Sequence, residues 1–183
     1  IRLLKSNFHD IWENSTSTRG VCLYSESDFD FTDRSIQVGN GSSDAQNNFS
    51  RSISGIVGFG EMTYSIRNNQ FGINDVAEDR LVRQGIAIST NGNKDITISN
   101  GNSFRQYNNG ILISRPGGKG TVLIDNNDFF QAFINSSNFT GTAINFFTVH
   151  PTKMLDATIS NNTIGTEAGT DQARIGIRLS MLD

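Results

Sequence analysis

Cysteine and proline are nearly absent from the sequence, with one cysteine (Cys22) and two prolines among 183 residues. A single cysteine excludes an internal disulfide bond and a zinc site made of four cysteines. No apolar stretch approaches the roughly 20 residues that a membrane-spanning helix needs, and no charged and then apolar leader precedes a small-residue cleavage site. We therefore expect no insertion into a membrane.

Charge is also scarce, at 18% of residues, and the formal net charge is −3. The 15 lysines and arginines are scattered along the chain. Because proteins bind nucleic acid mainly by neutralising phosphates with clustered basic residues, we expect no nucleic-acid partner.

The abundant residues are isoleucine (20, against 9 leucines and 8 alanines), asparagine (21) and glycine (18). Branching at Cβ favours extended backbone, and asparagine and glycine tolerate the positive φ angles of tight turns. This composition predicts an all-β chain of strands separated by turns.

A repeat organises the chain. The segment 64–71 (YSIRNNQF) recurs at 122–129 and 157–164, and at 96–104 with one extra residue. We place weaker copies at 1–8 and 29–36. The residues taken as equivalent in the six copies are Leu3, Phe31, Ile66, Ile98, Ile124 and Ile159.

A second block, glycine followed by an alternating strand, comes after each copy. It begins at Gly20, Gly55, Gly85, Gly110 and Gly176, and the fifth copy departs from the pattern, reading Gly141-Thr142-Ala143-Ile144. Alternation places one side of each strand in a core, which a short strand buries only by stacking on its equivalents about 4.8 Å away. We predict a single domain over 1–183, a right-handed parallel β-helix of about six coils.

Asparagine pairs fall where the chain must bend between two strands, at 68–69, 126–127 and 161–162, with Asn100-Gly101 at the matching place. We interpret them as structural, with amide groups that bond the coils above and below, rather than as ligands.

The pattern apolar-x-Ile-x-Asn-Asn-x-Phe, loop, Gly-Ile-x-Ile resembles the repeat of right-handed parallel β-helix proteins of the pectate-lyase-like superfamily. The last coil, 161–179, is similar to coils of large bacterial secreted and surface proteins. The resemblance implies an extracellular or cell-surface location and a scaffold. It implies no particular activity, because the catalytic motifs of the polygalacturonase branch (Asn-Thr-Asp, Asp-Asp, Gly-His-Gly and Arg-Ile-Lys) are absent. Because neither end looks like a cap, we expect a piece of a longer protein with flanking coils.

Candidate carbohydrate contacts are Trp12 and Tyr107, whose rings suit stacking on sugars, and Asp30 and Arg67, which belong to outward-facing rows. The alternatives are packing of the aromatic rings and an ordinary solvated sheet face. A further outward row, with Ala143 in an uncertain register, is unusually apolar, and we favour a loop folding over it. Its members are Cys22, Val57, Ala87, Leu112, Ala143 and Arg178.

The segment 28–33 (DFDFTD) is a candidate calcium site, because its carboxylates offer hard oxygen ligands. The alternative, which we prefer, is that Arg2 lies one coil away from Asp30 as its charge partner. We expect no other metal and no cofactor.

His150, Lys153 and Asp156 cluster in a long connection and are the catalytic candidates, as a proton acceptor and a charge stabiliser for polysaccharide cleavage. Solvated loop residues are the competing interpretation. Two functional hypotheses therefore stand. One is a secreted or surface scaffold that displays loops for adhesion or for contact with polysaccharide or host glycan, and the other is a lyase, hydrolase or epimerase. A purely structural spacer is a third possibility.

Overall fold

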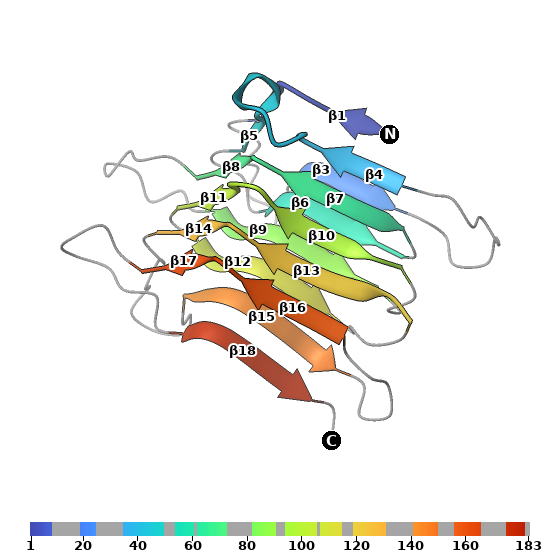
Figure 1. Ribbon diagram of the computed structural model, residues 1–183, viewed down its shortest axis with the longest axis vertical. Helices are drawn as coiled ribbons and strands as arrows, with labels where there is room; N and C mark the ends of the chain where they lie inside the picture. Colours follow the sequence, from blue (N-terminus) through green and yellow to red (C-terminus); the bar gives the residue numbers. More distant parts are fainter. Residues whose placement is uncertain are drawn as a thin grey trace.

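The computed structural model describes residues 1–8, 19–24, 35–49, 54–60, 62–72, 82–90, 94–105, 107–114, 119–130, 141–149, 156–165 and 175–181. Its strands form three parallel sheets of six strands each, stacked along the long axis of the molecule (Figure 1). We name them sheets A, B and C.

Sheet A contains β1 (Arg2–Leu3), β4 (Ser35–Val38), β7 (Thr63–Arg67), β10 (Ile96–Ser99), β13 (Thr121–Asp125) and β16 (Asp156–Ser160). Sheet B contains β2 (Asn7–Phe8), β5 (Asn48–Phe49), β8 (Gln70–Phe71), β11 (Ser103–Phe104), β14 (Asp128–Phe129) and β17 (Thr163–Ile164). Sheet C contains β3 (Arg19–Tyr24), β6 (Ser54–Phe59), β9 (Val82–Ser89), β12 (Tyr107–Ser114), β15 (Thr142–Val149) and β18 (Ile175–Met181).

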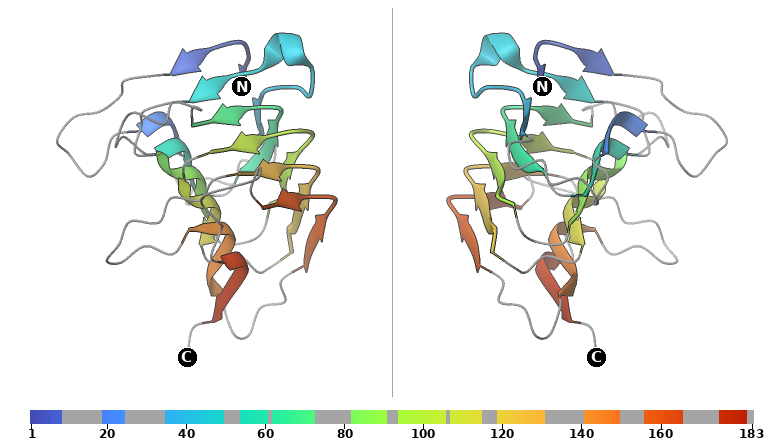
Figure 2. Two further views of the ribbon diagram at one scale, coloured as in Figure 1. Left: turned by 90° about the vertical axis from the view of Figure 1, so that its left-hand side faces the viewer. Right: turned by 90° about the vertical axis from the view of Figure 1, so that its right-hand side faces the viewer.

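Consecutive strands belong to different sheets, and each strand pairs in parallel with the strand three places along the chain. Figure 2 shows sheet C, which ends in the red strand β18, as a column of its own beside the other strands. We call three consecutive strands, one from each sheet, a rung. The predicted fold class, an all-β parallel solenoid, is confirmed, and no α-helix occurs in the described residues. The hand of the winding stays a prediction.

Like residues of successive rungs lie side by side, as predicted. Ile66, Ile98 and Ile124 are in register and each is 0% exposed. In sheet B the aromatic rings of successive strands stack with centroids 4.7–5.0 Å apart. This stack consists of Phe8, Phe49, Phe71, Phe104 and Phe129.

A ladder of buried asparagines runs beside the rings. Each member except the last donates from Nδ2 to Oδ1 of the member in the next rung, over 2.8–3.0 Å. Its members are Asn47, Asn69, Asn102, Asn127 and Asn162. The structural interpretation of the asparagine pairs is therefore confirmed. The two residues of a pair have different structural roles. The second asparagine forms the ladder, and the first, such as Asn68 or Asn126, adopts a positive φ at the bend.

The predicted second copy at 29–36 is wrong. Val38 pairs with Leu3 on one side and with Ile66 on the other, so Val38, and not Phe31, is the equivalent residue. The turn then contains an insertion with a short 3-10 helix, Ser43–Ala45, before the chain re-enters the pattern at Asn47. Residues 37–54 therefore contain parts of two strands and all of β5.

The register of the fifth glycine block is also corrected. Asn109 pairs with Thr142 and Ile111 with Ile144, so Ala143, and not Gly141, takes the place of the glycine. Leu112 pairs with Asn145, which makes Asn145 the member of the outward row that we assigned to Ala143.

Candidate functional site

The outer side of sheet A carries mostly polar side chains. Its side chains alternate with those that face the core and form three rows across the strands, and one of them, Ser99, is itself buried. We call these rows the hydroxyl face. The first row is Ser35, Thr63, Asp95, Thr121 and Asp156; the second is Gln37, Ser65, Thr97, Leu123 and Thr158; the third is Arg67, Ser99, Asp125 and Ser160.

Two carboxylates of the hydroxyl face are engaged with their neighbours. Asp95 Oδ1 accepts hydrogen bonds of 2.9 Å from both the backbone N–H and the hydroxyl of Thr121. These bonds, the backbone bond first, hold the pKa of Asp95 below its ordinary value. Asp125 Oδ1 accepts from the Ser160 hydroxyl at 2.7 Å and from Asn161 Nδ2 at 2.9 Å.

Arg67 is a basic residue of this face, in its third row on β7, and it is half-buried. Its Nε is shielded from solvent and has no hydrogen-bond partner among the described residues. An arginine next to rows of hydroxyl groups is suited to bind an oxygen-rich ligand through the terminal amino groups of its guanidinium. Of the predicted carbohydrate contacts, Arg67 is the one that the structure places on an outer face.

The other predicted contacts divide into two groups. Trp12, Asp30 and the segment 28–33 lie outside the described residues. Tyr107 is 1% exposed, and its ring makes edge contacts with Phe104 and Phe129 at centroid distances of 6.4 and 6.1 Å. Burial raises the pKa of the Tyr107 phenol. Tyr107 thus belongs to the core and offers no ring face to a sugar in solvent, which corrects its assignment as a stacking residue.

The register from which we expected Arg2 to be the charge partner of Asp30 is wrong, although Asp30 itself lies outside the described residues. Arg2 pairs in register with Gln37, so Gln37 occupies the neighbouring place on the face. Among the described residues, no group of three histidine, cysteine or acidic side chains is arranged to hold a metal ion.

Of the three catalytic candidates, the structure describes Asp156 alone. Asp156 begins β16 and is exposed on the surface, while His150 and Lys153 lie outside the described ranges. The enzyme hypothesis therefore stays a prediction.

The side chains in the apolar row of sheet C differ in how far they are exposed to solvent. Val57 is 6% exposed and Asn145 is 7% exposed, whereas Ala87 and Leu112 are half-buried and Arg178 is exposed. A cover over this row stays a prediction.

Sequence reasoning missed the first row of the hydroxyl face. The signal was present, because Thr63-x-Ser65-x-Arg67 and Asp95-x-Thr97-x-Ser99 extend the period-2 alternation by one step toward the N-terminus of each strand.

Comparisons of the chain with protein-family models, with curated proteins and with solved structures found no match. In the described part of the chain, no helix has the length and apolar character needed to cross a membrane.

Proposed function

We propose that the chain is a glycan-binding scaffold that contacts polysaccharide through the hydroxyl face of sheet A. The observation that carries the proposal is the placement of Ser65, Thr97 and Thr158 in one row across sheet A, with Arg67 in the neighbouring row on the strand of Ser65. A glycan chain presents many hydroxyl groups, and serine and threonine hydroxyls both donate and accept hydrogen bonds.

The spacing of the face supports contact with an extended polymer. Parallel strands lie about 4.8 Å apart, and side chains on one side of a strand recur about every 6.6 Å. The face therefore repeats the same polar groups in two directions. Such an array gains affinity from many weak contacts along a repeating ligand, as linked contacts add without a deep pocket.

Arg67 favours acidic sugars among the possible glycans. Its planar guanidinium matches a carboxylate in two-pronged geometry, and charge-assisted hydrogen bonds are roughly twice as strong as neutral ones. Asp95, Asp125 and Asp156 lie toward the C-terminal rungs of the same face. We therefore place the carboxylate of the ligand near Arg67 and its neutral hydroxyls over the later rungs.

The cellular setting is part of the same proposal. A rigid solenoid that binds polysaccharide belongs outside the cell, in the medium or at the surface, in the manner of pectate-lyase-like β-helix proteins that the repeat resembles. Loops that serve adhesion complete this proposed role.

The test is a glycan array that includes neutral and uronic-acid oligosaccharides, followed by calorimetric titration of the hits. We expect Arg67→Gln to weaken binding of acidic glycans by about 10-fold or more, the loss of one charge-assisted hydrogen bond. Thr97→Val removes a hydroxyl at nearly constant shape and should weaken binding by about 3- to 10-fold.

The matched control is Thr163→Val, since Thr163 is equally a surface threonine but lies on sheet B. It should leave binding unchanged. An array without any glycan signal, or equal binding by all three variants, would refute the proposal.

A further inference from the structure

Asparagine followed directly by glycine occurs four times in the chain, at 40–41, 91–92, 100–101 and 109–110. In such an Asn-Gly pair the backbone nitrogen of glycine can attack the side-chain amide carbon of asparagine, because glycine has no Cβ atom that blocks a close approach. The four pairs share this chemistry, so the fold decides how fast each one reacts. The structure describes three of them, all but 91–92.

The first Asn-Gly pair, Asn40 and Gly41, lies at the start of the insertion between β4 and β5, and both residues are exposed. A Cβ atom added to Gly41 would lie 3.4 Å from Nδ2 of Asn100, which belongs to the turn between β10 and β11, two rungs further along. This part of the insertion therefore lies at the corner between sheets A and B, beside interior rungs.

The side chain of Asn40 is folded back along the residues that follow it. Its Oδ1 accepts a hydrogen bond of 2.9 Å from the backbone N–H of Ser42. This bond closes a ring of atoms that contains both Cγ of Asn40 and the backbone nitrogen of Gly41. The two reacting atoms are thereby confined to one small ring, and such confinement is what raises the rate of intramolecular reactions.

The donor of this hydrogen bond is held in place by the short helix Ser43–Ala45, of which Ser42 is the N-cap. The Oγ of Ser42 accepts from the backbone N–H of Asp44 at 3.4 Å, and its carbonyl oxygen accepts from that of Ala45 at 3.0 Å. When a nucleophile attacks Cγ of Asn40, negative charge develops on Oδ1. A fixed N–H that already points at this oxygen stabilises that charge.

The attacking nitrogen of Gly41 is available for the reaction. Its N–H makes no hydrogen bond to any of the described residues. Because the residue is exposed, water reaches this N–H and can take up its proton. No bond of the fold has to break before the nitrogen attacks.

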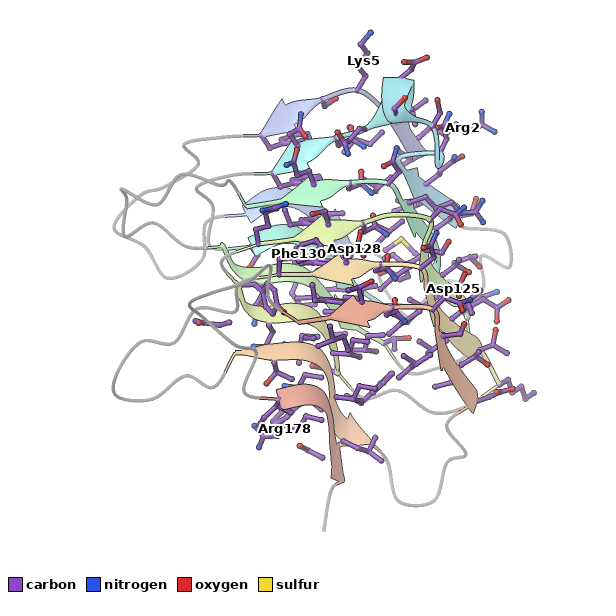
Figure 3. All side chains as sticks on the ribbon, turned by 60° about the vertical axis from the view of Figure 1, so that its left-hand side comes forward. Arg2, Lys5, Asp125, Asp128, Phe130 and Arg178 are labelled. Atoms are coloured by element: carbon purple, nitrogen blue, oxygen red, sulfur yellow. The ribbon has the colours of Figure 1, made fainter. Side chains whose placement is uncertain are left out.

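The pair Asn100 and Gly101 is tied to the next rung instead. The N–H of Gly101 donates to the carbonyl oxygen of Asn126 at 2.6 Å. The N–H of Asn100 donates at 3.2 Å to the carbonyl oxygen of Asp125, which Figure 3 labels. The bond of Gly101 must open before its nitrogen can attack, and the reaction therefore waits for a local opening of the turn.

The pair Asn109 and Gly110 lies inside β12, which is paired with β9 on one side and with β15 on the other. Gly110 is buried, and Oδ1 of Asn109 accepts from Nδ2 of Asn145 at 3.2 Å. Pairing on both sides keeps this backbone extended and away from water. Ring closure at Asn109 therefore also waits for an opening of the strands.

We propose that Asn40 is a site of spontaneous deamidation in the folded protein and reacts fastest of the three described Asn-Gly pairs. The Gly41 nitrogen gives up its proton and bonds to Cγ of Asn40, the bond from Cγ to Nδ2 breaks, and Nδ2 leaves as ammonia with the proton that Gly41 lost. One water molecule then opens the cyclic succinimide at either carbonyl group, which gives aspartate or isoaspartate. The modification adds one negative charge at residue 40 and does not depend on the proposed glycan binding.

The test is incubation of the folded protein at mildly alkaline pH, with peptide mapping by mass spectrometry at intervals. We expect Asn40 to be converted at least about 10-fold faster than Asn100 and Asn109, since a hydrogen bond that must open first slows a reaction by roughly this factor. In guanidinium chloride the three rates should become similar, because the sequence pair is the same. Equal rates in the folded protein would overturn the proposal, and so would slower conversion of Asn40 in the folded than in the denatured chain.

The product at residue 40 reports the route. Ring opening of the succinimide gives isoaspartate as well as aspartate, whereas direct hydrolysis of the side-chain amide gives aspartate alone. We expect isoaspartate in the peptide that contains residue 40. Aspartate without isoaspartate would contradict attack by the Gly41 nitrogen.

Two variants of Ser42 isolate the hydrogen bond to Oδ1. Ser42→Ala and Ser42→Pro both lose the hydroxyl group, but only proline also removes the backbone N–H. We expect Ser42→Pro to slow the conversion of Asn40 by about 3- to 10-fold, and the matched control Ser42→Ala to leave it unchanged. Equal rates in the two variants would show that the N–H does not assist the reaction. The comparison of folded and denatured wild-type protein tests the site itself even where the proline variant does not fold.

Discussion

Asparagine is the residue on which each turn between sheets A and B depends. Asn127 is 0% exposed, donates from Nδ2 to the backbone oxygens of Ile98 and Asp125, and accepts from Asn102 at Oδ1. These bonds satisfy carbonyl groups that the bend removes from the sheet ladders. A side chain with one acceptor and two donors is needed there, because a buried backbone group without a partner costs roughly 1–3 kcal/mol.

We predict that Asn127→Ala lowers the free energy of unfolding by about 3 kcal/mol, because it leaves several buried partners unpaired at once. The control is Asn126→Gly. Asn126 is exposed and has a φ of 53°, which glycine adopts freely, so its replacement should change stability by no more than about 0.5 kcal/mol. Urea denaturation of both variants measures the difference. If both variants lost the same free energy of unfolding, the ladder hydrogen bonds of Asn127 would contribute no more to stability than the residue at the bend, Asn126.

At the scale of the element, the strands of sheets A and C were predictable wherever Ile-x-Asn-Asn-x-Phe or Gly-Ile-x-Ile occurs without interruption. The second rung was misplaced because the insertion at 39–46 separates Val38 from Asn47, and the repeat was sought as one unbroken segment. The shorter signature Asn-x-Phe at 47–49, 69–71, 102–104 and 127–129 locates sheet B in spite of the insertion. The hydroxyl face was predicted in two of its rows. The clashes that require glycine next to the phenylalanine rings of the following rung depend on distances between rungs and are invisible in one strand.

The coupling between glycine and phenylalanine gives the prediction for neighbouring strands. Gly110→Ala should destabilise the protein by about 1–3 kcal/mol, because its Cβ would lie 2.7 Å from the Phe129 ring and 2.8 Å from the backbone oxygen of Ala143. In the background of Phe129→Ile, which copies the natural pair Ala143 and Ile164 at the same two positions one rung later, the cost of Gly110→Ala should fall by about 1 kcal/mol or more. Thermal unfolding of the four proteins of this double-mutant cycle measures the coupling energy. Strictly additive effects would show that the ring does not impose the glycine.

On the scale of the whole molecule, the solenoid is quasi-one-dimensional, since each rung contacts only the rungs before and after it. Stability in such an arrangement is a sum of rung terms and of interfaces between neighbours. Interior rungs have two interfaces, and the last described rung has one. The side chains of β16 that face the core are only half-buried, whereas their partners in β13 are buried.

Hydrogen exchange at low protein concentration should therefore show a gradient along the stack. Amides of β10, β11 and β12 have paired strands on both sides and are expected to exchange only through large openings. Those of β16, β17 and β18 should exchange at least roughly 10-fold faster, because opening the last rung breaks one interface instead of two. Uniform protection from β10 to β18 would mean that the molecule opens as one cooperative unit. It would contradict the expectation that single rungs open separately.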